Sequence, residues 1–427
     1  MANVISVNQL LAKNALASMH NALKFCRLVD RQLDNQFIKS QVNGFKPGNS
    51  FRINRPARYA SSIGAAIGGS DVEDMVEDPI YMTVADSDRR KIVNQFDSAT
   101  MTTELTNEKS RVGDPQGLQL ATDIEKKIVA ECLVGVQNGF VAVGNTTLGT
   151  SIGTEDLLKA QAYLDTLTCP EMERSCLIPP FTNAQLSREN LNLFTPTMNE
   201  NIAVKGFVKE FAGADLFRYN LLPTLSIPAL AGAGSVTTTV VDGASSVAVT
   251  FVAQTATKVF PAGTLLSFTA ERVNPETRES IGLAYTFAAK SAFTIPSGGG
   301  SVTIQIDEAS KIYGPADNGN RQNIVSLPTS GSAVTILGAK DSGVTDTATV
   351  FDQVLMFNKM AFSATMIPLE TDLPGAEASR ADYDGMSLRV AKQYVNGSDT
   401  VVTRFDVWGK GISQRDQYSV KILVPQA

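Results

Sequence analysis

The feature that most constrains the fold is a nearly uncharged, strand-forming stretch in the middle of the chain. Between residues 223 and 270 the only charged side chains are Asp242 and Lys258, while Thr, Val, Ser, Ala and Gly dominate. Valine and threonine favour strands, and small residues favour the turns between them. Asp242-Gly243 lies between two valine-rich runs and predicts a hairpin. We therefore expect a β-rich domain here, built as a small barrel or sandwich.

This β-rich segment interrupts a chain of different character. Turn signals separate further expected strands at residues 263–271, 283–295, 301–306, 322–327 and 333–337. The sequences before and after it mix helical and strand patterns, and 427 residues exceed what one hydrophobic core usually serves. We predict an α+β domain formed by residues 41–222 and 346–427, an N-terminal helical arm at 1–40, and an inserted β-barrel at 223–345.

Two apolar stripes at helical spacing predict long helices. The first runs over residues 7–37 and would be roughly 45 Å long if unbroken. Its apolar face needs a partner, which is either the chain's own core or a neighbouring copy. The second begins with Asp114 as N-cap and Pro115 in the first turn, and its stripe covers residues 118–139. A third helix is expected from Thr154, ending before Pro170.

Residues 50–84 are expected to form a long projecting hairpin-like arm, because two strand-like runs enclose a glycine-rich loop. A solvated loop is the simplest interpretation of its charges. A calcium loop is disfavoured, since the pattern of alternate oxygen ligands with a distant glutamate is missing. The sharper hypothesis is that ion pairs between neighbouring subunits form from the arm's charged side chains: Arg52, Arg55, Arg58, Asp71, Glu73, Asp74, Glu77 and Asp78.

Residues for catalysis or metal binding are scarce. His20 is the only histidine, so a Ser-His-Asp or Cys-His site would have to use it. The glycine clusters lack the lysine and serine of a phosphate loop. Cys169 and Cys176 have no second pair with which to bind zinc, so reduced thiols are expected. We predict no enzyme activity, no cofactor and no metal.

Charge and hydropathy disfavour two further classes. The formal net charge is -6, which argues against a strongly basic surface that grips nucleic acid. No run of about eighteen apolar residues occurs, so a membrane span is not expected. The first residues also lack the pattern of a secretory signal.

Several short motifs follow one another along nearly the whole chain. Phe45-Lys46-Pro47-Gly48-Asn49 leads into an Arg-Ile-Asn-Arg-Pro strand, and residues 206–225 end in Leu-Leu-Pro-Thr-Leu. Further motifs are the turns at 261–264 and 273–277 within the β-rich segment, and residues 356–367, 385–390 and 404–409 near the C-terminus. In this order around the β-rich segment, the motifs resemble the coat proteins of short-tailed bacteriophages.

The resemblance implies the shell fold common to tailed-phage capsids. Residues 1–40 would be the N-terminal arm, 50–84 the extended loop and 118–139 the spine helix. The segments 150–222 and after 350 would form the peripheral and axial subdomains, and 223–345 an inserted telokin-like β-barrel.

The implied function is that of a major capsid protein. Copies would assemble as pentamers and hexamers into an icosahedral shell, without cofactor or catalysis, and enclose the phage's double-stranded DNA without sequence-specific binding. A scaffolding protein and a portal would be further partners, and assembly would occur in the host bacterial cytoplasm before the protein becomes part of the virion. The alternative is a carbohydrate- or cell-binding β-domain protein of the adhesin type, with the Thr/Ser-rich segment as its binding module.

Overall fold

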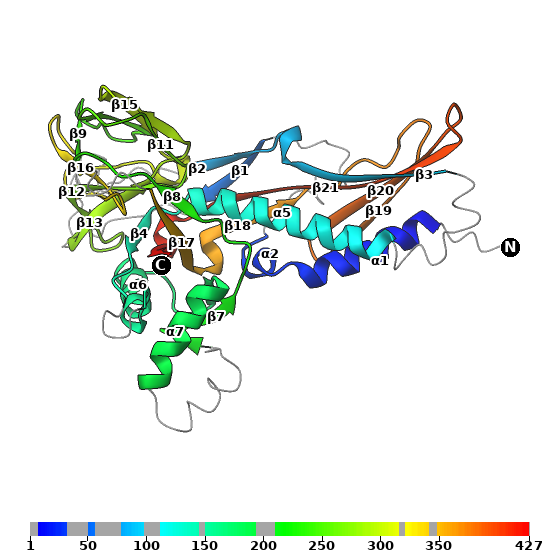
Figure 1. Cartoon of the computed structure of the whole chain (residues 1–427), viewed down its shortest axis with the longest axis horizontal. Coiled ribbons are helices and arrows are strands. Elements are labelled where there is room, and N and C mark those ends of the chain that lie inside the picture. Colours follow the sequence, from blue (N-terminus) through cyan, green and yellow to red (C-terminus); the bar gives the residue numbers. More distant parts are fainter. Residues whose placement is uncertain are drawn as a thin grey trace, which may run out of the picture. The chain divides into compact units, whose positions relative to one another are not determined.

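The computed structural model describes residues 7–31, 50–55, 78–97, 112–144, 150–193, 210–315, 321–340 and 348–426. The fold is mixed α+β with mostly strands (Figure 1). The chain divides into two compact units. Unit 1 comprises Met1–Arg52, Tyr81–Glu131 and Phe362–Ile412, and unit 2 comprises Ile53–Ile80, Cys132–Ala361 and Ser413–Ala427.

Unit 1 is built on one antiparallel sheet. Its strands run in the order β18-β21-β20-β19, and β3 pairs with β21. Their bounds are β3 Arg89–Asp97, β18 Phe362–Met366, β19 Glu377–Tyr383, β20 Met386–Val395 and β21 Thr400–Ser413. Alternate residues of the central strands are fully buried, including Leu388, Val390, Phe405 and Val407. One face of the sheet is therefore apolar, as period-two alternation requires.

The polar sequence of residues 370–384 predicts a loop, and this prediction is wrong for their second half. Residues 377–383 form β19, and all seven of them pair with residues of β20. The edge of β20 supplies the hydrogen-bond partners that make this polar sequence extended.

The N-terminal segment forms two helices where one was expected, α1 (Val7–Ala22) and α2 (Phe25–Leu28). The break at Leu23 and Lys24 has a clear cause. The main-chain N–H groups of Lys24 and Phe25 both donate to Oε1 of Glu125, the first at 2.6 Å, so neither continues the helix. The expected helical residues after position 31 lie outside the described residues.

Helix α1 packs against β19 and β20. Its apolar stripe is buried, with Leu11, Ala15, Leu16 and Met19 at most 4% exposed. Of the two partners left open above, the chain's own sheet covers this face.

Helix α5 (Asp114–Val134) begins where the N-cap predicted. Its expected end at residue 139 is wrong, because the helix stops before Gly135 and residues 138–141 form strand β4 (Asn138–Val141). A Cβ at Gly135 would lie 2.4 Å from the Cβ of Ser413. Strand β4 then pairs in parallel with β22 (Ser419–Pro425). The main-chain groups of residues 138–141 therefore form hydrogen bonds of a sheet and not of a helix.

Unit 2 contains a sheet in the order β4-β22-β17-β5-β7-β6, with β8 also paired to β17. The additional strands are β5 Arg174–Ile178, β6 Glu210–Phe211, β7 Ala214–Arg218, β8 Leu225–Ile227 and β17 Thr349–Asn358. Helix α6 (Thr154–Thr166) packs on β22, and α7 (Pro180–Leu193) contacts α6. The expected bounds of α6 are confirmed. The two runs expected to flank the arm are also strands, β1 (Ser50–Arg55) and β2 (Asp78–Thr83), and they pair with each other.

The β-rich segment also belongs to unit 2. It forms a sheet in the order β13-β12-β16-β9-β10-β15 and a smaller pair, β11-β14. The bounds are β9 Gly234–Val236, β10 Ser246–Phe251, β11 Lys258–Phe260, β12 Leu265–Val273, β13 Ser280–Ala288, β14 Phe293–Ile295, β15 Gly300–Gln305 and β16 Ala333–Ile336.

The predicted barrel is not closed. Strands β13 and β15 are the two edges of the six-stranded sheet, and they do not pair with each other in the part of the chain that the structure describes. The strand expected at 322–327 contributes only an isolated bridge between Ile324 and Arg272. The predicted tight hairpin is also longer than expected, since β9 ends at Val236 and β10 begins at Ser246.

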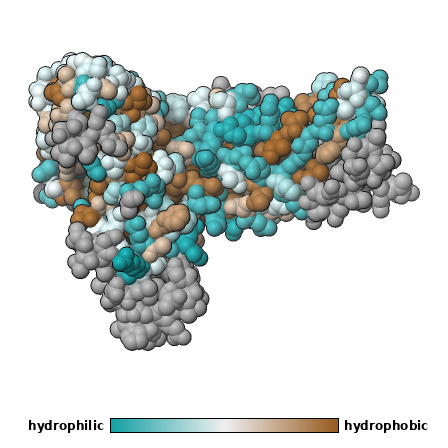
Figure 2. Space-filling view, in the orientation of Figure 1, coloured by the Kyte–Doolittle hydropathy of each residue, from teal (hydrophilic) through white to brown (hydrophobic). Residues whose placement is uncertain are grey.

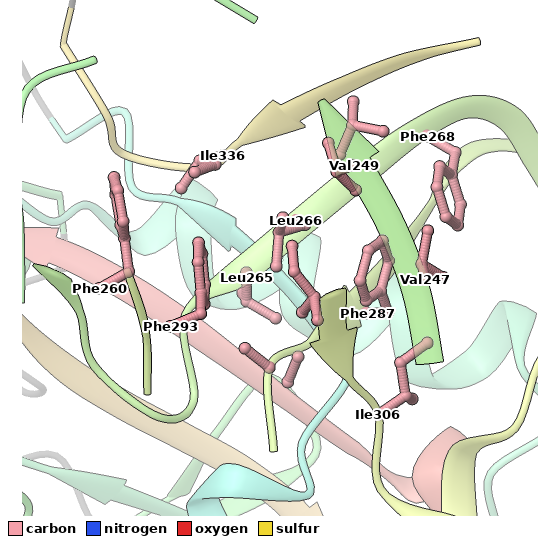
Figure 3. Packing of buried hydrophobic residues seen from close by; sticks show 14 of the residues in the cluster. Val247, Val249, Phe260, Leu265, Leu266, Phe268, Phe287, Phe293, Ile306 and Ile336 are labelled. Atoms are coloured by element: carbon pink, nitrogen blue, oxygen red, sulfur yellow. The ribbon is translucent and has the colours of Figure 1, made fainter. Parts of the chain in front are cut away.

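An aromatic core holds the β-rich segment together, and Figure 3 shows its side chains converging from several strands. The rings of Phe260 and Phe293 stack 5.0 Å apart, and those of Phe268 and Phe287 stack 4.8 Å apart. The same core includes Phe351 and Leu423, which lie beyond residues 223–345. The boundaries of an inserted domain therefore stay a prediction. On the face shown in Figure 2, this segment is covered mainly by side chains of intermediate hydropathy, as its Thr/Ser content predicts.

Candidate functional site

In the described part of the predicted arm, one candidate arginine forms a hydrogen bond within its own chain. Arg52 on β1 is exposed, and Arg55 is half-buried. Nη1 of Arg55 donates to the main-chain carbonyl of Ala309 at 2.6 Å, within the same chain. The other candidates lie outside the described residues, either wholly (Arg58, Asp71, Glu73, Asp74 and Glu77) or with their side chain (Asp78). The predicted ion pairs between subunits stay a prediction.

Three arginines surround one buried carboxylate in the sheet of unit 1. Asp406 on β21 is fully buried. It accepts hydrogen bonds from Arg389 Nη2 at 2.6 Å, Arg404 Nε at 2.7 Å and Arg89 Nη2 at 3.3 Å. Burial acts to raise the pKa of Asp406, but the hydrogen bonds from Arg389 and Arg404 and the charges of Arg89 and Arg404 together lower it. The carboxylate is therefore ionised at neutral pH.

The strand register extends this cluster into a row of charges. Directly opposed residues are Arg380 and Arg389, then Arg389 and Asp406, then Asp406 and Lys91. Opposed residues in antiparallel strands project to the same side of the sheet. We call the resulting surface the basic face and define it by its cations: Arg89, Lys91, Arg380, Arg389 and Arg404.

The basic face lies opposite the apolar face of the sheet, since its residues alternate with Leu388, Val390, Phe405 and Val407. Its cations are held in place by main-chain oxygens as well as by carboxylates. Arg389 Nη1 donates to the carbonyl of Glu370 at 2.8 Å, and Arg380 Nε donates to Asp382 at 2.8 Å. The Nε atoms of Arg89 and Arg389 are buried without a hydrogen-bond partner among the described atoms.

A second charged cluster joins helix α5 to β21 and is internally balanced. Lys127 Nζ lies 2.8 Å from Asp88 and 2.6 Å from Glu131, while Lys410 Nζ lies 3.5 Å from Asp88. Burial acts to raise the pKa of Asp88, but the Ala85 N–H, Lys127 and Lys410 lower it. Two cations and two carboxylates leave no excess charge. We therefore assign this cluster a role in holding α5 against β21.

Lys421, a buried lysine of unit 2, has no carboxylate partner in the described ranges. Lys421 on β22 is fully buried, and within the described ranges no salt bridge reaches it. Its Nζ donates to the carbonyl of Gly263 at 2.6 Å and lies 3.5 Å from that of Leu133, in the last turn of α5. Burial lowers the pKa of Lys421 to about 7. The side chain thus caps a helix end and holds the turn before β12.

The structure also places the histidine and the cysteines that could serve catalysis or zinc binding. His20 Nε2 lies 3.2 Å from Asp384 Oδ2, next to Arg31, and its ring meets Tyr383 edge-on. These contacts within the described part of the chain involve no serine or cysteine. Burial raises the pKa of the Cys169 thiol to about 11 and raises that of Cys176 further, so both are protonated.

The described residues contain neither a metal-binding cluster nor a membrane-spanning helix. No group of three or more His, Cys, Asp or Glu side chains is arranged to hold a metal ion. Among the helices of that part of the chain, none is long and apolar enough to cross a membrane.

No protein-family model matches this sequence, and no curated protein matches it significantly. Among solved structures, the chain is similar to one described as Mycobacterium phage Che8, with 11% identity, 94% of this chain and 90% of that chain covered, and a TM-score of 0.45. It is similar to the mature capsid of bacteriophage PhiM1, with 10% identity, 88% and 82% covered, and a TM-score of 0.44. It is also similar to a virus-like particle from Pyrococcus furiosus, with 9% identity, 98% and 100% covered, and a TM-score of 0.40. Because all three TM-scores are below 0.5, the function proposed below rests on this chain's own residues.

The sequence interpretation missed the basic face. Residues 400–408 have the sequence TVVTRFDVW, which is typical of a strand. Arg404 and Asp406 are two residues apart in it and therefore project to one side, which was the available signal. Their partners Arg89 and Arg389 come from two other strands, and only the pairing register brings them together.

Proposed function

We propose that this chain is the major capsid protein of a tailed bacteriophage, and that copies of it assemble into the icosahedral shell around double-stranded DNA. The observation that carries the proposal is the order of coat-protein motifs along the sequence, from residues 45–49 to residues 404–409, around a β-rich segment. No catalytic role is needed for this function, because the subunit acts through its contacts with copies of itself.

Two structural features support a subunit that associates with other chains. Strand β3 pairs with β21 only, as far as the described residues go, so its second edge presents unpaired main-chain groups. Such an edge is a template for contact with another chain. The basic face adds charged side chains next to that edge, and charged rims guide and orient association.

The finer assignment is part of the same proposal. The chain would be of the short-tailed phage type, with residues 223–345 as an inserted, telokin-like β-domain. The arm residues Arg52, Arg55 and Arg58 would meet the carboxylates of residues 71–78 across subunit contacts. A scaffolding protein and a portal would take part in assembly in the host cytoplasm.

The test is to express the full chain and examine the purified protein by negative-stain electron microscopy and analytical ultracentrifugation. Closed shells or polymers of capsid size are the expected result. A monodisperse small oligomer that binds glycans would overturn the proposal and favour the adhesin-type alternative. Adding a scaffolding protein from a related phage keeps the test decisive if the chain alone forms only irregular polymers, because uniform shells should then appear.

A further inference from the structure

The turn that joins β20 to β21 lies at the far end of these two strands in unit 1 (Figure 1). Its four residues, 396–399, are all exposed. The N–H of Ser398 donates to the carbonyl of Val395 at 3.2 Å and closes the turn. Neither the N–H of Gly397 nor the side-chain amide of Asn396 has a hydrogen-bond partner among the described residues. These two groups are therefore free to react with each other.

An asparagine followed by glycine is open to attack by its own main chain. Gly397 has no Cβ, and open space surrounds the position that a Cβ would take, so its main-chain nitrogen can approach Cγ of Asn396. The attack forms a bond between this nitrogen and Cγ and breaks the bond between Cγ and the amide nitrogen. The amide leaves as ammonia, with the proton that the Gly397 nitrogen loses, and a five-membered succinimide ring remains. Water then opens the ring, at Cγ to give aspartate or at the main-chain carbonyl carbon of Asn396 to give isoaspartate.

We propose that Asn396 is a site of spontaneous modification, at which the folded protein replaces a neutral amide with a carboxylate and needs only water as co-reactant. Another Asn-Gly pair, Asn138-Gly139, provides the structural contrast. Asn138 is fully buried in β4, and its Nδ2 donates to the main-chain carbonyls of Asp416 at 2.7 Å and Ser419 at 3.0 Å. The same dipeptide is thus held in the core at one position and exposed at the other. The fold, and not the dipeptide alone, decides where the reaction occurs.

The product changes both the charge and the main chain of the hairpin tip. Asp399 in the turn is exposed, and so is Asp97 on β3, which lies opposite Thr400. The new carboxylate therefore adds a third negative charge at the tip. Isoaspartate also adds one carbon atom to the main chain of the turn, and the length of the turn sets the register of the pair Val395 and Thr400 beside it. Modified copies also become substrates for an isoaspartyl methyltransferase, which transfers a methyl group from S-adenosylmethionine to this carboxylate.

Peptide mapping by mass spectrometry tests the site on the full-length, unassembled subunit, so the result does not depend on shell formation. The protein is kept in mildly alkaline buffer, either folded or unfolded in urea. Trypsin then releases Asn396 within residues 393–404 and Asn138 within residues 128–159. In the folded protein Asn396 should react at least about tenfold faster than Asn138, because the buried pair reacts only after local opening. In urea the two should react within about twofold of each other, since glycine follows both and the fold no longer separates them.

Two variants and one control sharpen the assignment. Gly397→Ala places a Cβ beside the attacking nitrogen and should slow the modification of Asn396 at least about fivefold, while the fold is kept because that Cβ meets open space. Asn396→Gln keeps an amide but would have to close a six-membered ring, so this position should accept no methyl groups from labelled S-adenosylmethionine and a purified isoaspartyl methyltransferase. Gly298→Ala, at another glycine in open space, should leave Asn396 reacting at the wild-type rate.

Three results would refute the modification site. One is an equal rate at Asn396 and Asn138 in the folded protein. The second is a wild-type rate at Asn396 in the Gly397→Ala variant. The third is reaction of Asn396 in urea but not in the folded protein, which would show that the turn holds Cγ and the Gly397 nitrogen apart. None of these results bears on the proposed capsid function, which the microscopy of the assembled chain decides.

Discussion

Lys421 gives the sharpest prediction about stability. Its ammonium group is fully buried and has no carboxylate partner among the described residues, so the free energy of unfolding should depend on pH. Its pKa falls from an ordinary value of 10.5 to about 7 on folding, through burial. Between these two pH values the unfolded chain holds a proton that the folded chain has released. The unfolding free energy therefore rises with pH across this window, and the destabilisation is fully present below pH 7.

The size of the effect follows from the same two values. Each pH unit of lowering corresponds to about 1.4 kcal/mol, so the window from pH 7 to pH 10.5 amounts to about 5 kcal/mol as an upper limit. Lys421→Met removes the titrating group and keeps most of the side-chain volume. It also leaves the carbonyls of Gly263 and Leu133 without this donor, which costs about 1–3 kcal/mol at every pH. The pH-dependent and the pH-independent parts of the change in unfolding free energy can therefore be measured separately.

Urea unfolding of the unassembled subunit, measured from pH 7 to pH 10, checks this prediction. As the pH rises, the unfolding free energy of the wild type should increase by several kcal/mol relative to that of Lys421→Met. All other titrating groups are common to both proteins, so this difference reports Lys421 alone. Lys340→Met, at an exposed lysine, should keep the wild-type pH profile. A constant difference between wild type and Lys421→Met across the window would refute the reasoning.

Two further predictions concern the cluster in unit 1 and the end of helix α5. Asp406→Asn should lower the unfolding free energy by about 3–5 kcal/mol, because it leaves three guanidinium groups around a neutral amide, whereas Asp382→Asn at a half-exposed pair should cost at most about 1 kcal/mol. Since the pKa of Asp406 is lowered on folding, its contribution is present above the ordinary value of 3.8 and is lost as the pH falls through the folded value, which acid titration of the two variants would reveal. Gly135→Ala should lower the melting temperature by several degrees, because its Cβ would lie 2.4 Å from that of Ser413, whereas Gly298→Ala, with open space around it, should change the melting temperature little. A melting temperature for Gly135→Ala equal to that of Gly298→Ala would contradict the close approach at Ser413.

Features fixed by neighbouring residues were predictable from the sequence. The start of α5 follows from Asp114 and Pro115, and the start of α6 follows from Thr154 with acidic residues behind it. These signals act within one helical turn, so no distant partner can change them much.

Features fixed by distant residues were not predictable. The polar sequence of β19 becomes a strand because β20 pairs with it, and helix α5 ends early because Gly135 meets Ser413, far away in the sequence. The break after α1 depends on Glu125, a hundred residues further on. The register that assembles the basic face likewise joins four strands, β3, β19, β20 and β21, from two separate parts of the sequence. Periodicity contains no information on any of these pairings.

The structure divides its charges between two tasks, and the division has a physical reason. A carboxylate such as Asp406, fully buried under three guanidinium groups, cannot be removed without leaving unpaired charge, so it fixes the register of β3, β20 and β21. An exposed cation such as Lys91, at the rim of the same cluster, contributes at most about 1 kcal/mol to any one ion pair. Weak contacts of this kind can form and break while copies of the chain find their places, and their repetition over many subunits makes the finished assembly stable. Substitutions at the centre of the cluster should therefore act on folding, and those at its rim should act on association.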